Sequence, residues 1–275
     1  MTCHINIATG GHDRYSIVAL HSSLSSGRQW TSLIEACGRQ YPVVAPDIFG
    51  HGANTPTRDG PATLAAEARF LSEALESIDG PIHLIGHSYG GAIAFKLATA
   101  SRWSERVRSL TLIEPVLPTL LLDDPASRHL HDEFAQLGDS MRADIGSTRS
   151  SRALDRFLDF WAGSAPSQPP AGGLRERMIA TIEKLASNNF ASLLSEQKVA
   201  EAAATLSIPT LLICGGRSPE MTQRIVARLA SIISSAKATF VPTAGHMLAV
   251  THAALVNPGI IEHVQQADSR LHDHT

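Results

Sequence analysis

Short apolar runs alternate with longer segments of helical spacing, and this alternation limits the possible folds more than any other feature. Each run has the length of a strand and is apolar at nearly every position, as in a parallel sheet covered on both faces. The segments between them, such as 64–78 and 222–233, gather apolar residues on one helical face. We therefore expect an α/β fold with a mostly parallel, doubly wound sheet. The runs are Ser16–Leu20, Pro42–Ala45, Ile82–Ile85, Ser109–Ile113, Thr210–Cys214 and Ala238–Val241.

The alternation stops after Ile113 and resumes near Ile208. The intervening stretch has no clear strand and contains a loop rich in Pro, Gly and Ser at 163–173. We interpret 116–205 as a helical cap over the carboxyl edge of the sheet, and 1–115 with 206–275 as the α/β core. The tail from Ala267 onward is expected to fray. The helix-like pieces of the cap are 127–137, 153–161, 174–185 and 192–203.

Composition narrows the classes of protein. A chain of 275 residues that is 43% hydrophobic can bury one large core. Its formal net charge is -3 without a basic stripe, which argues against nucleic acid or an anionic membrane as partner. The three cysteines are widely spaced, which disfavours a disulfide framework or a cysteine zinc site. Lacking an apparent signal peptide or membrane span, the protein is expected to be cytoplasmic. Four histidines near the C-terminus (His252, His263, His272, His274) are expected at the surface.

A nucleophile motif lies between one strand run and a helix. Residues 86–90 read Gly-His-Ser-Tyr-Gly and join the run Ile82–Ile85 to the helical segment Gly91–Ala100. A Gly-x-Ser-x-Gly pattern in this context predicts a tight, strained turn that exposes the hydroxyl of Ser88. Flanking glycines are needed because a side chain at Gly86 or Gly90 would collide with neighbouring elements. The helix N-terminus adds partial positive charge. A plain Gly/Ser turn is the alternative.

A serine hydroxyl needs a base, and His246 is the preferred candidate. It follows the last strand run, and ligands of parallel sheets bind beyond the carboxyl ends of the strands, where Ser88 also lies. The histidines at 21, 51 and 87 are more easily explained by loop packing.

The sequence offers more than one candidate for the acid that would orient His246. Its usual place follows the run Thr210–Cys214, where Ser218 stands instead of an aspartate. Glu114 directly follows an earlier run, Ser109–Ile113, and a buried carboxylate at a strand end needs a partner such as histidine. We assign Glu114, with Glu220 or no direct acid as alternatives.

An acyl-transfer site also needs donors for the developing oxyanion. One is expected to be the backbone N–H of Tyr89, the residue after the nucleophile. The other is expected from the loop His21–Leu24 that follows the first strand run.

These motifs together resemble the α/β-hydrolase superfamily, in its capped esterase, epoxide-hydrolase and dehalogenase branch. The resemblance rests on His21 with Trp30, the stretch 47–52 (Asp-Ile-Phe-Gly-His-Gly), the elbow at 86–91 and Ala-Gly-His-Met at 244–247. It implies an eight-stranded sheet, of which the first strand is expected to be missing here. The family's oxyanion loop usually reads His-Gly-x, but Ser22 replaces the glycine, so Ser23 takes the amide-donor position.

Ser88 at the nucleophile position argues against dehalogenases and epoxide hydrolases, which resemble this family but use an aspartate there. We expect hydrolysis of a small, largely apolar carboxylic ester or lactone through an acyl-enzyme, without metal or organic cofactor. The alternatives are a C–C bond or thioester hydrolase with the same triad, or a non-catalytic, receptor-like binding protein. The oligomeric state stays open. Candidate pocket residues are Ser22, His87, Phe157, Phe160, Trp161 and Met247, although the aromatic residues also fit ordinary core packing.

Overall fold

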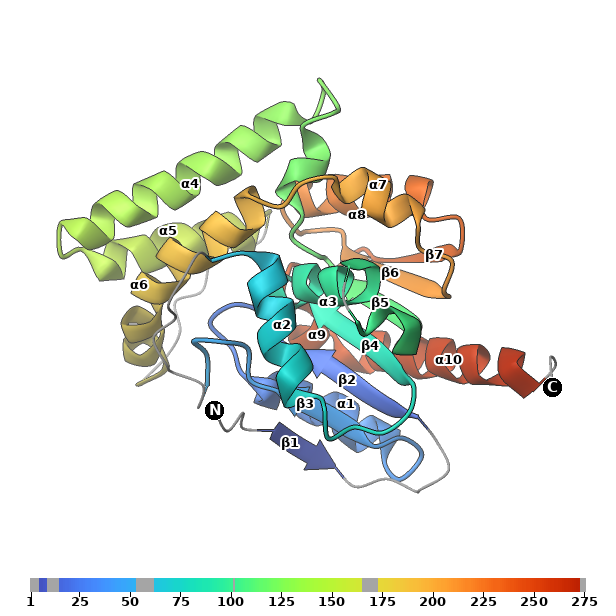
Figure 1. Cartoon of the computed structure of the whole chain (residues 1–275). Helices are drawn as coiled ribbons and strands as arrows, with labels where there is room; N and C mark the ends of the chain where they lie inside the picture. The colour runs from blue at the N-terminus through green and yellow to red at the C-terminus, as the bar shows by residue number, and fades with distance from the viewer. Residues whose placement is uncertain (1–4, 9–14, 53–61, 101, 165–172, 273–275) are drawn as a thin grey trace.

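A seven-stranded sheet forms the centre of the molecule (Figure 1). The computed structural model describes residues 5–8, 15–52, 62–100, 102–164 and 173–272. The strand order is β1-β3-β2-β4-β5-β6-β7, with β1 antiparallel to β3 and the remaining pairs parallel. The predicted α/β fold with a mostly parallel sheet is confirmed. The strands are β1 (Ile5–Ala8), β2 (Ser16–Leu20), β3 (Val43–Pro46), β4 (Ile82–His87), β5 (Val107–Ile113), β6 (Thr210–Gly215) and β7 (Ala236–Val241).

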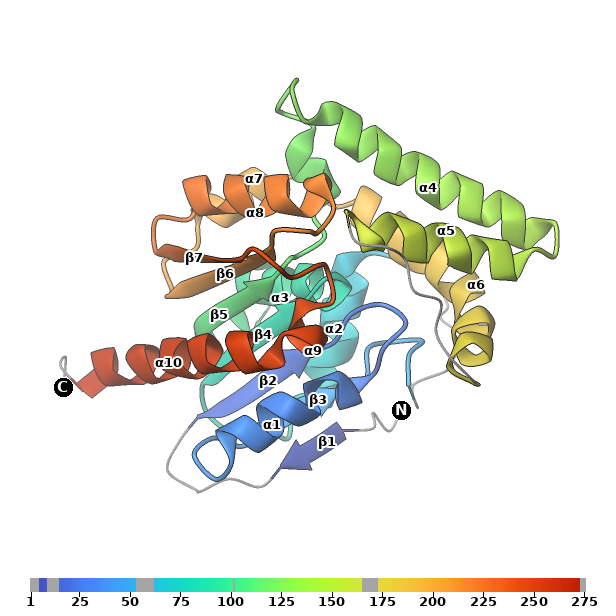
Figure 2. The ribbon, with the colours of Figure 1, turned by 180° about the vertical axis from the view of Figure 1, so that it is seen from behind.

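Helices cover both faces of the inner strands, as apolar runs without alternation require. The edge strand β7 departs from this expectation, because its residues 237–240 are exposed. In β2, Ile17 and Ala19 belong to one apolar cluster, and Val18 and Leu20 belong to the other. The first cluster includes α1 (Thr31–Cys37), α9 (Leu248–Thr251) and α10 (Ala253–His272), and Figure 2 shows α1 and α10 on that face. On the opposite face lie α2 (Leu64–Ala74), α3 (Tyr89–Ala100) and α8 (Glu220–Ile232).

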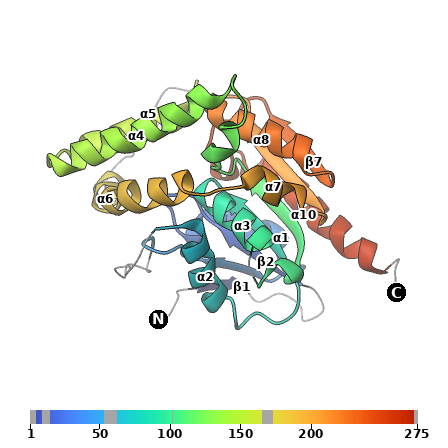
Figure 3. The same ribbon diagram turned by 45° about the horizontal axis from the view of Figure 1, so that its top comes forward.

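Helices also occupy the long insertion between β5 and β6, above the carboxyl ends of the strands (Figure 1). Figure 2 shows α4 and α5 running side by side, and Figure 3 shows α6 beside them. The two helices expected at 174–185 and 192–203 are instead the long α6 and the short α7, with the break between them at 195–198. The division into core and cap at 116 and 205 stays a prediction, and most of the loop 163–173 lies outside the described residues. The helices are α4 (Arg128–Gly146), α5 (Ser150–Ala162), α6 (Gly173–Leu194) and α7 (Val199–Ala204), with 3-10 turns η1 (Gly27–Trp30), η2 (Ser104–Arg106) and η3 (Pro118–Leu121).

The C-terminal segment corrects two expectations. The chain does not fray at Ala267, because α10 continues to His272 and buries Ala267 against the sheet. His263 is buried rather than solvated, since it lies on the same face of α10 as Val256 and Ile260. His274 lies outside the described residues. The packed face of α10 thus fixes this helix to the sheet.

Two further observations concern the cysteines and the helices. Cys37 and Cys214 are free, buried thiols, and Cys3 lies outside the described residues. Within the described ranges, none of the helices combines the length and the apolar character needed to cross a bilayer.

Candidate active site

The turn from β4 into α3 places Ser88 above the carboxyl edge of the sheet. Ser88 has a φ of +57°, a left-handed conformation that costs energy in a residue other than glycine. A Cβ on Gly86 would lie 2.4 Å from the carbonyl oxygen of Gly90, and one on Gly90 would lie 2.4 Å from that of His21. The backbone N–H of Ser88 donates to Ile113 at 2.9 Å. The expected strained turn and the need for both glycines are therefore present.

Three polar side chains from separate loops form a hydrogen-bonded row at this turn. The Ser88 Oγ lies 2.9 Å from Nε2 of His246, and Nδ1 of the same ring lies 2.6 Å from Oε2 of Glu114. All three residues are buried. A carboxylate can only accept, so Nδ1 carries the proton and Nε2 is left to accept from the serine hydroxyl. The row has the polarity that proton removal from Ser88 requires.

Glu114 is surrounded by donors at the end of β5. Its Oε1 accepts from the backbone N–H of Gly215 at 2.6 Å and from the hydroxyl of Ser218 at 2.5 Å. Burial raises the pKa of Glu114, but the hydrogen bond and charge of His246, with the bonds from Ser218 and Gly215, outweigh burial and leave the pKa below its usual value. The carboxylate thus stays ionised at neutral pH.

The structure distinguishes between Glu114 and Glu220, the two carboxylates that the sequence offered as partners of His246. Glu220 is more than half exposed and pairs with Arg224 at 3.1 Å, one turn further along α8. Ser218 holds the position where an aspartate was expected, and it donates to Glu114 instead. The chain therefore brings Glu114, and not Glu220, onto His246.

The loop that follows β2 is held by its own polar groups. Both the N–H and the hydroxyl of Ser22 donate to Oε1 of Gln29, at 3.0 and 2.8 Å. The Ser22 carbonyl accepts from Nδ1 of His21 at 2.7 Å, and Nε2 of that ring accepts from the N–H of Ile48. The Oγ of Ser23 accepts from Nδ2 of Asn189 on α6 at 3.0 Å. Ser22, which stands where the family usually has glycine, thus has its N–H, its hydroxyl and its carbonyl all hydrogen-bonded.

A narrow cavity opens beside Ser88, with an empty volume of about 230 Å³. Four polar residues, Ser23, Ser88, Tyr89 and Asn189, lie at one part of its wall, and the rest is apolar. Its apolar lining residues are Val116, Phe134, Phe157, Trp161, Phe190 and Leu193.

The predicted pocket residues divide into two groups. Phe157 and Trp161 line the cavity. Ser22 and His87 are buried and do not line it, because both are engaged in hydrogen bonds below the site. Met247 is 40% exposed and does not line it either.

Trp161 also contacts the reacting row directly. Its ring stacks on the imidazole of His246, with centroids 4.1 Å apart and planes at 23°. On another side, the His87 ring lies 5.2 Å from that of His246. The α5 helix of the insertion therefore helps to hold the histidine of the core.

Phe160, the third aromatic candidate, packs against Phe134 and Trp161 rather than lining the cavity. Gln29 and Asn189 are not among the residues predicted from the sequence. Both reach partners far away in the chain, so no local pattern marks them. Ser218 was noticed, but its role as donor to Glu114 was not. Among the described residues, no three His, Cys, Asp or Glu side chains are grouped as a metal site would require.

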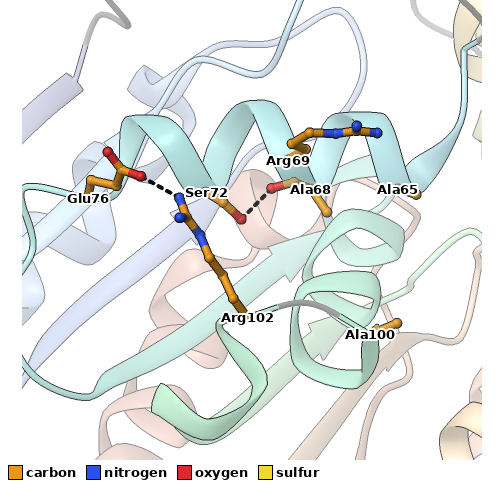
Figure 4. Close-up of a pocket in the computed structure, with 7 residues that line it drawn as sticks. All are labelled: Ala65, Ala68, Arg69, Ser72, Glu76, Ala100 and Arg102. Atoms are coloured by element: carbon orange, nitrogen blue, oxygen red, sulfur yellow. Dashed lines mark hydrogen bonds and ion pairs between the residues drawn. The ribbon is translucent and has the colours of Figure 1, made fainter.

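A larger groove lies elsewhere, between α2 and the C-terminal end of α3 (Figure 4). It has an empty volume of about 900 Å³ including open solvent, and an exposed ion pair between Arg102 and Glu76 at 2.5 Å crosses it. None of its described lining residues is a histidine or a nucleophile in a strained turn, so they offer no chemistry like that of Ser88. Its lining residues are Ala65, Ala68, Arg69, Ser72, Glu76, Ala100 and Arg102.

Comparisons with known proteins identify the family. Lipase LipV of Mycobacterium tuberculosis is 31% identical over 144 residues, but the match covers only about half of each chain (52% and 51%). A pimeloyl-[acyl-carrier protein] methyl ester esterase of Xanthomonas campestris is 27% identical, over 91% of this chain and 94% of its own. The solved structure of MenH from S. aureus superposes with a TM-score of 0.79 at 17% identity, covering 96% of this chain and 99% of that one. A model of the alpha/beta hydrolase family matches residues 17–258, and the chain belongs to this family as an esterase-type hydrolase.

Proposed function

We propose that the protein is a serine hydrolase that cleaves a small, largely apolar carboxylic ester or lactone through an acyl-enzyme. The observation that supports this most is the row Ser88–His246–Glu114, with its serine in a strained turn that opens on an apolar cavity. The names of two relatives, a lipase and a methyl ester esterase, favour an ester as substrate.

The first half of the reaction forms the acyl-enzyme. Ser88 attacks the carbonyl carbon while Nε2 of His246 takes the hydroxyl proton, and Glu114 stabilises the resulting imidazolium. The backbone amides of Ser23 and Tyr89 hold the negative charge that develops on the carbonyl oxygen, and Tyr89 is also the first residue of α3, where the helix dipole favours an anion. His246 then gives its proton to the leaving alcohol oxygen.

The second half regenerates the enzyme. His246 removes a proton from water as the water attacks the acyl carbon, and the carboxylic acid leaves when Ser88 regains its proton. The six apolar lining residues would receive the acyl chain. Because the cavity is narrow, a short or compact acyl group fits this proposal better than a long one. A cytoplasmic location stays a prediction from sequence.

The test uses purified protein, a fluorophosphonate probe and nitrophenyl esters of increasing acyl length. We expect covalent labelling of the wild type at Ser88, and turnover highest for short acyl chains. Ser88→Ala should be neither labelled nor active, whereas Glu220→Gln, on the surface of α8, should behave as the wild type. A wild type that is unlabelled and inactive on esters and lactones would contradict the proposal. Thioesters and a C–C diketone belong in the same panel, because the same row of residues can attack those carbonyl groups, and tight binding without turnover would instead favour a receptor.

A further inference from the structure

A chain of hydrogen bonds runs below the site from the loop after β2 to the loop that carries His246. The N–H of Ser22 donates to Oε1 of Gln29 at 3.0 Å. The other end of that carboxamide, Nε2, lies 3.1 Å from Nδ1 of His87, and Nε2 of His87 lies 2.8 Å from the carbonyl oxygen of His246. Two side chains, Gln29 and His87, thus connect two backbone groups that are far apart in the sequence.

The direction of every bond in this chain follows from its two ends. A backbone N–H can only donate, so the oxygen of the Gln29 amide must face Ser22, and its NH₂ group must face His87. A backbone carbonyl can only accept, so His87 must carry its proton on Nε2 and accept on Nδ1. Burial lowers the pKa of His87 to about 3, with the nearby His246 adding to the effect, so the ring stays neutral at ordinary pH. One tautomer of His87 and one orientation of the Gln29 amide therefore satisfy all four groups, which are the Ser22 N–H, the Gln29 carboxamide, the His87 ring and the His246 carbonyl.

The chain connects the three segments that the proposed reaction must keep in register. Ser22 precedes Ser23, whose amide is the proposed oxyanion donor. His87 precedes Ser88, the proposed nucleophile. The third segment is that of His246, whose own carbonyl oxygen is the last acceptor. The second bond to Gln29, from the Ser22 hydroxyl at 2.8 Å, exists only because serine stands where the family usually has glycine.

We infer that Gln29 is a positioning residue, which through neutral His87 holds the Ser23 amide and the His246 imidazole in register for attack by Ser88. The inference rests on the proposed function. Gln29 lies in the short turn η1 and touches neither the cavity nor the reacting row. Its effect therefore acts through Ser22 and His87, and we expect it in kcat more than in KM.

Two substitutions separate positioning from mere packing. Gln29→Met has a similar length but neither accepts well nor donates, so the chain is lost at every pH, and kcat should fall about 10- to 100-fold with little change in KM. Gln29→Glu still accepts from Ser22 but cannot donate to His87. The His87 ring can then satisfy both neighbours only by holding two protons, one on each nitrogen. We therefore expect Gln29→Glu to approach wild-type kcat at low pH and to lose it as the pH rises and His87 gives up the second proton.

The pH profile of kcat distinguishes these outcomes. Gln265→Glu, which adds the same charge on exposed α10, is the control and should keep the wild-type profile. Wild-type kcat for Gln29→Met, or the same pH profile for Gln29→Met and Gln29→Glu, would overturn the inference. Thermal unfolding of each variant shows whether the protein is folded at the assay temperature.

A measurement that does not depend on turnover tests the role of Gln29 separately from the proposed function. Nitrogen chemical shifts of the His87 ring should report a neutral Nε2–H tautomer in the wild type from about pH 5 to 9, and a doubly protonated ring at the low end of that range in Gln29→Glu. An Nδ1–H tautomer in the wild type would refute the chain even in an active enzyme. If the ring shows the expected tautomer but the wild type neither reacts with the fluorophosphonate nor cleaves esters, the proposed function fails and the hydrogen-bond chain stands without its catalytic purpose.

Discussion

Two sets of serine, histidine and carboxylate lie at opposite ends of the sheet, with similar hydrogen-bond lengths. At the carboxyl ends of the strands, His246 lies 2.9 Å from Ser88 and 2.6 Å from Glu114. At the amino ends, His83 lies 2.9 Å from Ser109 and 3.0 Å from Asp268. Distances and residue types alone therefore do not distinguish a reactive set from a structural one.

The backbone of the serine distinguishes them. Ser109 lies within β5, directly across from His83 in the register of β4 and β5, and is 1% exposed. Its bond to His83 is thus an ordinary contact between neighbouring strands. Ser88 instead occupies a turn with positive φ, precedes a helix and lines a cavity. The set at the amino ends has neither access to a substrate nor an adjacent helix N-terminus.

The two imidazoles are also turned in opposite ways. In His246, Nδ1 faces the acid and Nε2 faces the serine, whereas in His83 it is Nε2 that faces Asp268. Asp268 further accepts from the hydroxyl of Tyr41 at 2.7 Å. The set at the amino ends therefore joins α10 to the sheet and to the start of β3. We expect it to contribute to stability, and the set at the carboxyl ends to contribute to catalysis.

The largest expected difference between the two sets concerns their serines. Ser88→Ala should lower kcat by about 10⁴-fold or more, because the nucleophile is removed. Ser109→Ala should leave kcat within about twofold and lower the free energy of unfolding by about 1–2 kcal/mol, since a buried ring nitrogen loses its partner. Ester hydrolysis and urea unfolding of both variants measure this. A large loss of kcat in folded Ser109→Ala would erase the distinction between the two ends.

The acids should differ nearly as much. In Glu114→Gln, the amide oxygen must stay with the N–H of Gly215 and the hydroxyl of Ser218, so the NH₂ group turns to His246. Nδ1 then becomes an acceptor, and Nε2 carries a proton and can no longer accept one from Ser88. We expect kcat to fall about 10³- to 10⁴-fold. Asp268→Asn should change unfolding rather than kcat, and equal effects on kcat in both variants would contradict this assignment.

The set at the carboxyl ends was largely predictable, because Ser88 and Glu114 directly follow a strand and His246 lies in the loop after the last one. Ser88, Glu114 and His246 come after three different strands, and parallel strands bring their carboxyl ends to one edge of the sheet. Their positions after strands therefore predict that all three lie at this edge, without knowledge of the loop conformations. The set at the amino ends has no such local signal, because Asp268 belongs to a helix more than 150 residues away from Ser109 along the chain.

Two structural elements escaped prediction for physical reasons. Pro258 and Gly259 indicate a helix break, but α10 continues through them because Val256, Ile260 and Val264 pack on the sheet. The edge strand β1 has four residues, too few for a clear pattern, and its partner β3 defines it. Tertiary packing decided both cases, and the same holds for the contacts of Gln29 and Asn189.

Acidification should lower the stability of both ends of the sheet, because buried histidines with lowered pKa values lie at both. Burial lowers the pKa of His21 and His87 to about 3 and that of His263 to about 4, from 6.5. The unfolded chain therefore binds more protons below about pH 6.5, and the free energy of unfolding falls as the pH falls, by about 2 kcal/mol per such group at pH 5. Glu114, whose pKa is lowered, adds a further loss of stability below about pH 4.5.

Urea unfolding at pH 7 and pH 5 measures this fall. His263→Gln, at the amino ends, should reduce the difference between the two pH values by about 2 kcal/mol, since one titrating group is removed. His129→Gln, on the exposed face of α4, is the matched control and should leave the difference unchanged. An unchanged difference in His263→Gln would mean that this ring is protonated in the folded protein at pH 5.

The smallest expected effect concerns the aromatic ring beside each histidine. Trp161 stacks on His246 at 4.1 Å, whereas Tyr41 meets His83 edge-on at 5.9 Å. An aromatic face stabilises a cation by about 0.5–2 kcal/mol, and His246 becomes a cation during the proposed reaction. Trp161→Leu should therefore lower kcat about 3- to 30-fold, and Trp161→Phe should recover much of it. Tyr41→Leu should lower stability while leaving kcat of the folded fraction unchanged. Equal kcat in Trp161→Leu and the wild type would show that the stacked ring only fills space, and that the contact between α5 and His246 does not contribute to the chemistry.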